Sequence, residues 1–442
     1  MTTQLIPIIG LEVHIEPNTK TKMFCACPQD HFGKKPNTQV CPICLGLPGA
    51  LPFANKEAVD KTIKLGLALG SAISSSSKFY RKNYFYPDLP KGFQTSQLDS
   101  PLCIGGKLNG IQINHIHLEE DAGKLVHETL DGKKYSLVDF NRSGCALMEL
   151  VTEPVFHDLK SVIDFVKELQ LITRYLDISG ADMERGSMRL EANVSLSPFT
   201  SGPLPSYKVE LKNINSFKFL EKAVSAELAR QEKAINAGEK LVQETRGYDE
   251  AKQTTFSQRT KADAHDYRYF PEADLPPIAI GELAVNNLQL SIPELPQAKR
   301  ERFEKEYGIS KDFIAILVSD LERANYFEKS IRLASLAQDK SSVSPKIVAD
   351  LMINKKLDGQ YPEPAGLVKR ILEIATVDYS TVSDVENAVK SVLMENEKAV
   401  KDYQNGNGNV VGFLIGMVQK KLEGKGNTQT VREKLLEKMQ NG

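Results

Sequence analysis

Residues 115–153 hold an unusual number of side chains that can take part in a reaction. They begin HIHLEEDAGK and end LVDFNRSGCALMELVTE, so carboxylates, histidines and an Asn-Arg pair are threaded between apolar residues. At strand spacing, Glu120 falls in phase with Leu118, and Glu149 falls in phase with Leu147. Burying carboxylates in this way costs free energy unless a cation or hydrogen-bond donors compensate. We therefore expect the reaction centre here.

A strand near the N-terminus offers further candidate ligands. In the segment GLEVHIE, strand alternation places Glu12, His14 and Glu16 on one face. Between Ile113 and Ile116 the hydrophobic phase slips, which predicts a β-bulge, and bulges are common beside active sites. Both segments therefore present polar side chains from strands.

Brought together, Glu12, His14, Glu120 and Glu149 would form a site for a divalent metal ion. Carboxylates suit Mg²⁺, whose shell is completed by water and phosphate, and the imidazole suits Mn²⁺ equally well. The alternative is that these acids are exposed strand residues paired with Lys or Arg, because ion-pair networks also gather charges. Taken as a set, the four residues favour the metal site.

Four of the six cysteines form two close pairs, Cys25-x-Cys27 and Cys41-Pro-Ile-Cys44. Thiolates are soft ligands, and four of them suit a tetrahedral Zn²⁺. Four cysteines leave no open position for water, so such a zinc would be structural. The alternative is a cluster of free core cysteines. His31 lies between the pairs and is interpreted as a loop residue.

Basic and aromatic residues are interleaved in FYRKNYFYPDLPKGFQTSQ, which contains Arg81, Lys82 and Lys91. Basic groups bind phosphate and aromatic faces stack on bases, although Tyr and Phe are also common core residues. No Walker loop, GxGxxG helix start or GxSxG elbow occurs. The usual nucleotide and esterase motifs therefore give no assignment.

The bulk composition is that of an ordinary globular protein, with 41% hydrophobic and 26% charged residues. A length of 442 residues predicts two or three domains. The net charge of −1 argues against a chain coated with nucleic acid but not against a local basic face. No apolar run of about 18 residues occurs, so no membrane span is expected. The N-terminus lacks the features of a signal peptide, and a cytoplasmic location is expected.

The elements that position these residues change in character along the chain. Up to about residue 290, short β-rich segments are interrupted by amphipathic helices, predicted at 56–70, 159–176 and 217–236. Strands and helices without regular βαβ alternation predict an α+β fold.

Beyond SIPELPQ the strand signals vanish, and helix follows helix. YPEPAG (361–366) and NGNGN (405–409) predict breaks, and a last amphipathic helix is predicted at 428–440. We therefore predict three domains: 1–292, 293–366 and 367–442.

Taken together, the motifs closely resemble the GatB/GatE family, the B subunits of aspartyl/glutamyl-tRNA amidotransferases. The resemblance covers nearly the whole chain and rests on IGLEVHIE, KMFCACP, VCPICLGLPGALP, FYRKNYFYPDLPKGFQTSQ, HLEEDAGK, VDFNRSGCALMELVTEP, ELKNINSF and DYRYFPEADLP, in the family's order. It implies a cradle-like N-terminal domain, a helical domain and a helical tail like that of the YqeY family.

The resemblance also implies a reaction. ATP phosphorylates the side-chain carboxylate of glutamate or aspartate mischarged on tRNA, and ammonia then displaces the phosphate. Such chemistry needs a Mg²⁺ clamp and cationic groups. Glu12, His14, Glu120 and Glu149 match the family's metal-site positions. The residues expected to contact ATP or the tRNA end are Arg81, Lys82, Arg142, Arg189, Asn193 and Lys212.

The implied assembly is a heterotrimer with an amidase (A) subunit, which makes ammonia from glutamine, and a small C subunit. The helical tail would hold the body of the mischarged tRNA, Glu-tRNA(Gln) or Asp-tRNA(Asn). In this interpretation the chain is one subunit of a glutamine-hydrolysing carbon–nitrogen ligase. The alternatives are a non-catalytic tRNA-binding scaffold with a structural zinc, and a stand-alone glutamine-hydrolysing enzyme, which is disfavoured because no amidase nucleophile motif occurs.

The chain departs from the family pattern at several positions. Ala146 and Met148 replace the Pro and branched aliphatic residue of the NRxGxPLxE signature, and Leu190-Glu191 stands where Cys-Asp is usual. FPEAD replaces FPEPD, and the region 358–390 is shorter than usual. These changes make the reaction centre and the tail the parts to test first.

Overall fold

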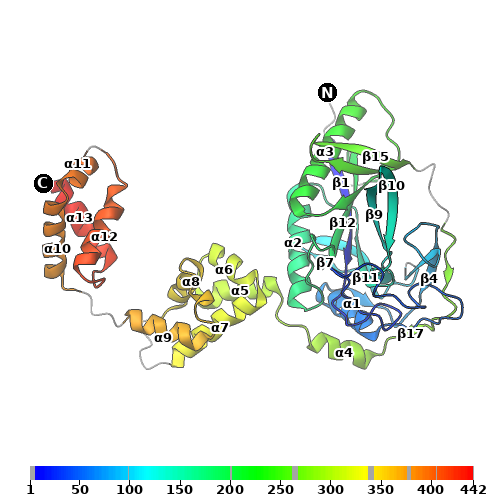
Figure 1. Cartoon of the computed structure of the whole chain (residues 1–442), viewed down its shortest axis with the longest axis horizontal. Helices are drawn as coiled ribbons and strands as arrows, with labels where there is room; N and C mark the ends of the chain where they lie inside the picture. The colour runs from blue at the N-terminus through cyan, green and yellow to red at the C-terminus, as the bar shows by residue number, and fades with distance from the viewer. Residues whose placement is uncertain are drawn as a thin grey trace. The chain divides into compact units, whose positions relative to one another are not determined.

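The computed structural model describes residues 5–97, 99–199, 202–260, 267–336, 343–375, 380–404 and 406–441. The chain forms two compact units, Met1–Arg302 with Val318–Leu321, and Phe303–Leu317 with Glu322–Gly442 (Figure 1). The first boundary between the two units along the chain follows Arg302. The predicted domain boundaries at 292 and 366 stay predictions.

Unit 1 is built on one large mixed sheet, which has 13 strands in the part of the chain that the structure describes. Its main path runs β15-β14-β13-β12-β1-β11-β8-β5-β4-β16, and all its pairs are antiparallel except β13 with β14. The strands of unit 1 are β1 Ile6–Ile15, β2 Ala72–Ile73, β3 Ser76–Ser77, β4 Tyr80–Asn83, β5 Phe93–Ser96, β6 Cys103–Ile104, β7 Lys107–Leu108, β8 Ile111–Glu120, β9 Lys124–Leu130, β10 Lys133–Asp139, β11 Ala146–Thr152, β12 Met188–Ser197, β13 Val209–Ile214, β14 Glu244–Asp249, β15 Thr254–Thr260, β16 Phe270–Pro271 and β17 Ile278–Ala279.

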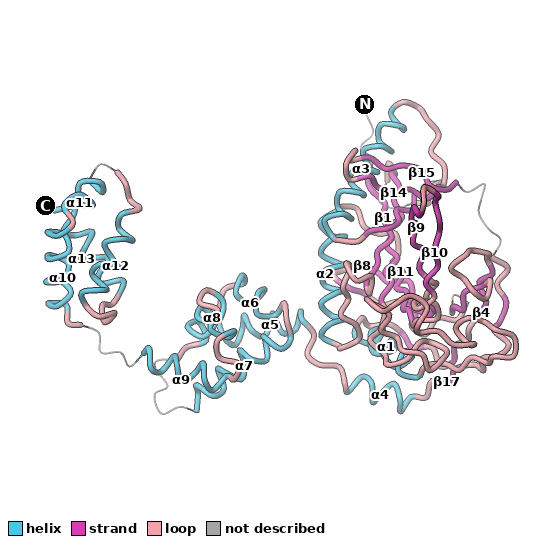
Figure 2. The backbone as a smooth tube through the Cα atoms, in the orientation of Figure 1, coloured by secondary structure: helices cyan, strands magenta, loops and turns pink. Residues whose placement is uncertain are grey.

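Three helices cover the apolar face of this sheet, and Figure 2 shows two of them, α2 and α3, running beside the strands. Their bounds are α1 Lys56–Ala68, α2 Leu159–Tyr175 and α3 Phe217–Asn236, in agreement with the helices predicted from periodicity. Helix α2 buries Phe165 and Leu169 against the sheet, and the Asp158 carboxylate caps it by accepting from the Ser161 N–H at 2.8 Å. This packing confirms the α+β class.

The predicted bulge lies in β8. His115 is opposite Val151 and Ile113 is opposite Thr152, so Asn114 is the extra residue. Ile113 and Ile116 can therefore both enter the core although they are three residues apart. The bulge resets the alternation and decides which later side chains of β8 face away from the core.

The remaining described elements are helical, and they include no strand beyond residue 279 in the described ranges. Helix α4 (Glu282–Leu290) has no fully buried residue, and its Leu288 packs, partly buried, against the core of unit 1. The later helices are α5 Pro296–Tyr307, α6 Lys311–Val318, α7 Leu321–Leu336, α8 Pro345–Ile353, the short 3₁₀ helix η2 Leu357–Gly359, α9 Pro364–Ala375, α10 Val382–Glu395, α11 Glu397–Gln404, α12 Val410–Lys421 and α13 Thr428–Asn441.

Helices α10, α12 and α13 share a small core of their own that includes Val389, Leu414 and Leu435. The predicted break at 405–409 separates α11 from α12, although Asn405 lies outside the described residues. The predicted last helix at 428–440 is α13. None of the helices in the described ranges has the length and apolar character that crossing a bilayer requires.

Residues 25–44, which we call the cysteine loop, are bound to the turn that precedes β11. The Asn37 N–H donates to Asp139 Oδ1 at 3.0 Å, and the Gln39 N–H donates to Asn141 Oδ1 at 2.8 Å. The Gln29 side chain donates to the Ala146 carbonyl at 3.0 Å and accepts from the Ala146 N–H at 2.9 Å. These hydrogen bonds hold the loop beside the first residue of β11.

A lysine inside this junction is fully buried. Lys22 has no exposed surface, and its Nζ donates to the carbonyls of Ser143 at 2.8 Å and Gln39 at 2.9 Å. A buried ammonium is tolerated only where acceptors surround it, and here they come from both sides of the junction. Lys22 thus ties the cysteine loop to the turn.

We expect Lys22→Ala to destabilise unit 1 by about 2–4 kcal/mol, because it leaves a cavity and buried carbonyls without donors. Calorimetry of the unfolding transition of unit 1 would measure the loss. Lys20→Ala, at an exposed position nearby, is the matched control and should change stability by less than about 0.5 kcal/mol. Equal stability of the two variants would contradict the role of Lys22.

Candidate active site and cysteine centre

One face of the central sheet, opposite the helices, carries a row of polar and charged side chains that we call the acid face. The row crosses neighbouring strands in register: Glu149 of β11 is opposite His14 of β1 and His117 of β8. On the other side of β1, Arg189 is opposite His14 and Glu191 is opposite Glu12. The members are Glu12, His14, His117, Glu119, Glu149, Arg189, Glu191, Asn193, Glu210 and Lys212.

Three of these residues form what we call the central group: His14, Glu119 and Glu149. His14 Nε2 lies 3.4 Å from Glu149 Oε2 and 3.7 Å from Glu119 Oε1. One ligand atom from each residue lies within 4.8 Å of the others, a separation that one metal ion can bridge. His117 Nε2 lies 3.4 Å from the same Glu149 oxygen. The geometry gathers two carboxylates and two imidazoles around one small volume.

Burial and charge shift the pKa values of this group in opposite directions. Burial raises the pKa of Glu119 to about 7, and Glu149 adds to the shift. Burial acts to lower the pKa of His14, but the carboxylates of Glu149 and Glu119 outweigh it and raise that pKa to about 9. Burial opposes ionisation of Glu149 too, yet His14, His117 and Lys82 hold its pKa well below the usual range. The three ionisable groups are therefore strongly coupled to one another.

His117 is buried, and one of its two ring nitrogens lacks a partner within the described ranges. Burial lowers its pKa to about 4, so the ring is neutral near pH 7. Its Nδ1 atom is buried and has no hydrogen-bond partner among the described residues. Both features are typical of a site built for a group that the protein chain itself does not supply.

Glu12 belongs to a second cluster, the distal group of Glu12, Glu191 and Glu210. Asn193 Nδ2 donates to Glu12 Oε1 at 2.8 Å, and Lys212 Nζ lies 2.9 Å from Glu191 Oε2 and 3.3 Å from Glu210 Oε1. Burial, together with Glu149 and Glu191, raises the pKa of Glu12. Glu12 therefore neighbours the central group and interacts with it electrostatically but has its own partners.

The structure corrects the expected place of Glu120. Its carboxylate accepts from Lys91 Nζ and from the Thr95 N–H at 2.9 Å, on the face opposite to His14. Glu120 is in register with Ala146, whereas Glu149 shares its face with Leu147, which is opposite Glu119. The apolar residues that flank the two acids thus lie on different faces of the sheet, and Glu119 takes the position expected of Glu120.

The predicted phosphate-binding residues divide into two sets. Lys82 belongs to the set that lies near charged groups of the acid face. Burial opposes its positive charge, but the carboxylates of Glu119 and Glu149 hold its pKa above the usual range. Asn193 and Lys212 bind the distal group, as described above. Arg189 Nη1 donates to Asp121 Oδ2 at 2.7 Å beside His14.

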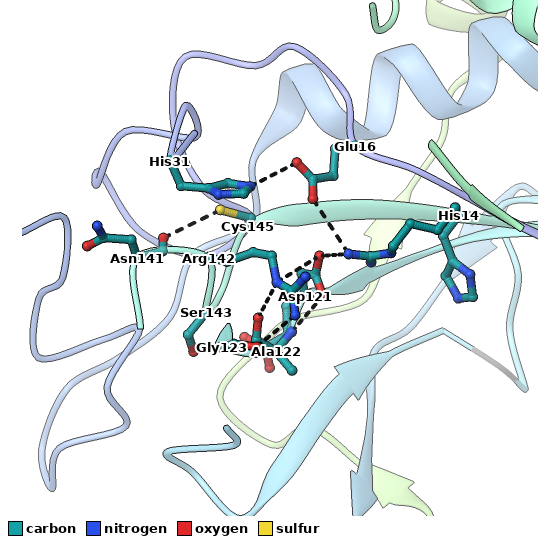
Figure 3. Close-up of polar contacts among 12 residues, drawn as sticks. His14, Glu16, His31, Asp121, Ala122, Gly123, Asn141, Arg142, Ser143 and Cys145 are labelled. Carbon is teal, nitrogen blue, oxygen red and sulfur yellow. Dashed lines mark hydrogen bonds and ion pairs between the residues drawn. The ribbon is translucent and has the colours of Figure 1, made fainter. Parts of the chain in front are cut away.

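Arg81 and Arg142, by contrast, are occupied by the chain itself. Arg81 forms two hydrogen bonds with Glu272, at 2.7 and 2.6 Å, and stacks on Phe93. Arg142 donates to the carbonyls of Ala122 at 2.9 Å and Gly123 at 2.7 Å (Figure 3). These bonds give both arginines a structural role, which the sequence did not indicate.

The cysteine centre forms as expected. Cys25, Cys27, Cys41 and Cys44 place their sulfur atoms within 4.8 Å of one another. A hydrogen bond from Cys25 lowers the pKa of Cys44 to about 5, and Lys22 Nζ lies 3.8 Å from that sulfur. Four soft sulfur donors this close together fit a metal ion. His31 is not part of the centre, because its Nε2 lies 3.1 Å from Glu16 Oε2.

Sequence reasoning missed Glu119, His117 and Asp121. A signal existed for the first two, because the bulge puts Glu119 in phase with His117 and out of phase with Ile116 and Leu118. No local pattern marks Asp121, whose importance comes from Arg189, distant in the sequence.

Comparison with known proteins places the chain among relatives of full length. The model of the GatB/GatE catalytic domain matches residues 7–286, and a GatB domain model matches residues 335–439. The chain is 41% identical to a protein of Thermodesulfovibrio yellowstonii over 96% of this chain and 97% of that protein. It is also 41% identical to one of Dehalococcoides mccartyi over 100% of both chains.

Both relatives, and a third from Thermomicrobium roseum at 41% identity over 98% of each chain, are named as a subunit, designated B, of aspartyl/glutamyl-tRNA(Asn/Gln) amidotransferase. The catalytic-domain match covers the strands that carry the central group and the distal group, and the loop that carries the cysteine centre. The chain therefore belongs to the GatB/GatE family.

Proposed function

We propose that the chain is the subunit of an aspartyl/glutamyl-tRNA amidotransferase that activates and amidates the mischarged amino acid. Its substrates are Glu-tRNA(Gln), Asp-tRNA(Asn) or both, and ATP supplies the phosphoryl group. Ammonia comes from glutamine hydrolysed by a partner amidase subunit. The observation that carries this proposal is the buried central group, lying in a catalytic domain whose relatives of full length bear the name of that enzyme.

His14, Glu119 and Glu149 would hold a Mg²⁺ ion. Two carboxylate oxygens and one imidazole nitrogen leave room for water and phosphate oxygens, and the same donors suit Mn²⁺. The buried Nδ1 of the neighbouring His117, which is unpartnered among the described residues, supports the fit, because it indicates that a contact is missing. Bound there, the ion would neutralise charge on phosphate oxygens as the phosphoryl group is transferred.

The residues of the chain would orient the reactants around this ion. Lys82 and Arg189 border the central group from two sides and would attract the phosphates of ATP and the substrate carboxylate. Asn193 and Lys212 fix the distal group, so that Glu12 keeps a defined place beside His14. Such fixed charges need no reorganisation during the reaction, which is why they lower the barrier.

The cysteine centre would hold a structural Zn²⁺. All four positions of a tetrahedral shell are filled by sulfur, so the ion would offer no place for a substrate. Its effect would be to hold the cysteine loop closed against the turn before β11.

The remaining parts of the proposal concern the assembly. We propose a heterotrimer with the amidase and a small third subunit, in which the C-terminal helices hold the tRNA body. The reaction would take place in the cytoplasm, where mischarged tRNA is made. The names of the relatives, as single subunits of tRNA amidotransferases, support this arrangement.

The division of labour between subunits gives a first test. Purified alone, the chain should hydrolyse no glutamine, and coexpression with an amidase partner should give ATP-dependent amide formation on at least one of the two mischarged tRNAs. Glutaminase activity in the single chain, or no amide formation with any partner, would contradict the proposal.

Glu119→Gln and Glu149→Gln should each lower ATP-dependent amide formation by about 100-fold or more, because each removes a charged ligand of the proposed Mg²⁺. The Mg²⁺ concentration for half-maximal activity should also rise. Affinity for tRNA, measured by filter binding, should stay within a few-fold.

Two controls sharpen this test. Glu128→Gln changes an exposed acid on the β9–β10 hairpin and should leave activity unchanged. Glu120→Gln weakens a buried ion pair with Lys91 and should reduce stability without shifting the Mg²⁺ dependence. A shift of that dependence in Glu120→Gln but not in Glu119→Gln would reverse the assignment made here.

Cys41→Ser should abolish stoichiometric zinc, measured by elemental analysis of the purified protein, because zinc–thiolate sites need their full ligand set. The unfolding temperature of unit 1 should fall with it. Cys103→Ser, at a buried cysteine outside the centre, should keep the zinc. If the unmodified protein contains no zinc and unfolds at the same temperature as Cys41→Ser, the four cysteines are core residues and not metal ligands.

A further inference from the structure

A row of charged side chains connects the cysteine loop to the acid face. His31 Nε2 lies 3.1 Å from Glu16 Oε2, and Glu16 Oε1 lies 3.7 Å from Arg189 Nη1. The same Arg189 nitrogen donates to Asp121 Oδ2 at 2.7 Å. Figure 3 shows Glu16 lying between His31 on one side and the Asp121 cluster on the other. The row joins residues that are far apart in the sequence.

The carboxylates of this row are largely buried and therefore need hydrogen-bond donors or positive charges close by. The side chains of Glu16 and Asp121 are 11% and 7% exposed, and both face one guanidinium. Burial resists the charge of Asp121, yet Arg142 and Arg189 hold its pKa far below the usual range. Burial raises the pKa of Glu16, while His31 and Arg189 act against the rise. Each carboxylate therefore depends on its own donors to stay in place.

The position of Arg189 matters because it borders the central group. It is opposite His14 in the β1–β12 ladder, and its charge interacts with Glu119. Glu16 and Asp121 both contact the same nitrogen of this guanidinium, so a loss of either contact would leave the side chain less firmly held. Glu16 in turn has His31 as its partner on the side away from Arg189.

The cysteine loop sets where His31 stands. His31 lies between the two cysteine pairs, and the loop touches the sheet on either side of it. Gln29 forms two hydrogen bonds with the backbone of Ala146, the first residue of β11. The Phe32 ring lies 4.6 Å from the guanidinium carbon of Arg185, in the turn before β12. The loop thus contacts the strand that carries Glu149 and the lead-in to the strand that carries Arg189.

We propose that His31 is a positioning residue of the reaction: acting through Glu16, it holds the Arg189 guanidinium beside the central group, so that the cysteine loop controls the phosphate-binding end of the site. This inference rests on the proposed function, which assigns Arg189 to phosphate. It gives the cysteine loop a part in the reaction besides the stability that a structural metal supplies.

The test compares His31→Ala with His31→Gln in the assembled amidotransferase. His31→Ala removes the donor to Glu16 and should raise the KM for ATP about 5-fold or more, with a smaller change in kcat. His31→Gln keeps an N–H donor and should restore the KM to within about 2-fold of the original. Direct ATP binding, measured by calorimetry, should follow the same order. His127→Ala, at an exposed histidine of the β9–β10 hairpin, is the control and should behave as the unmodified protein.

A double-mutant cycle identifies the route of the effect. Arg189→Lys keeps the charge but loses the planar fork, and by itself should raise the KM for ATP. If His31 acts through Arg189, adding His31→Ala to Arg189→Lys should cause little further change. Zinc content and the unfolding temperature should stay unchanged in His31→Ala.

The outcomes separate two kinds of failure. If Arg189→Lys leaves ATP binding unchanged, the assignment of Arg189 to phosphate fails, and the role of His31 that rests on it fails too, while the metal site is tested separately by Glu119→Gln and Glu149→Gln. If Arg189→Lys impairs ATP binding but His31→Ala does not, or if the two effects add in full, the positioning role of His31 is wrong and the proposed function stands. A loss of zinc or of stability in His31→Ala that His31→Gln does not restore would also overturn it, because the effect would then be structural.

Discussion

Strand alternation allows a sheet residue only two directions, and in this protein one of them is filled by the hydrophobic core. Helices α1, α2 and α3 cover the apolar face, so every polar side chain of β1, β8, β11 and β12 that lies out of phase with the core must share the other face. The carboxylates of Glu119 and Glu149 are consequently brought close together, and each raises the free energy of ionising the other. The basic residues around them, and the metal ion proposed here, follow from that crowding.

The positive charges that offset these carboxylates are spread along the sheet. Lys212 neutralises the distal group, and Arg189 borders the central group on the opposite side of His14 from Glu149. Lys82 interacts with Glu119 and Glu149 from β4. The cysteine loop supports this arrangement from outside: it binds the turn before β11 and places His31 against Glu16. The contacts that stabilise this end of unit 1 therefore also position the residues of the proposed site.

Much of this could be predicted from the sequence, for reasons that are local. Amphipathic periodicity located α1, α2 and α3, a slip in phase located the bulge at Asn114, and cysteine spacing located the cysteine centre. What failed depended on contacts between distant segments. Glu120 was expected beside Glu149 because each acid is in phase with apolar neighbours, but those neighbours lie on different faces of the sheet. Arg81 and Arg142 were predicted to contact ATP or the tRNA end, and the sequence did not reveal their partners, Glu272 and the carbonyls of Ala122 and Gly123, because these lie elsewhere in the chain.

The central claim is that His14, Glu119 and Glu149 hold a divalent cation. Anomalous diffraction at the manganese edge, from crystals soaked in Mn²⁺, tests it most directly, because Mn²⁺ accepts the same oxygen and imidazole donors as those found here. We expect an anomalous peak within bonding distance of all three side chains and none beside Glu120. A peak on the Glu120 side of the sheet, or no peak at the central group at saturating Mn²⁺, would contradict the claim.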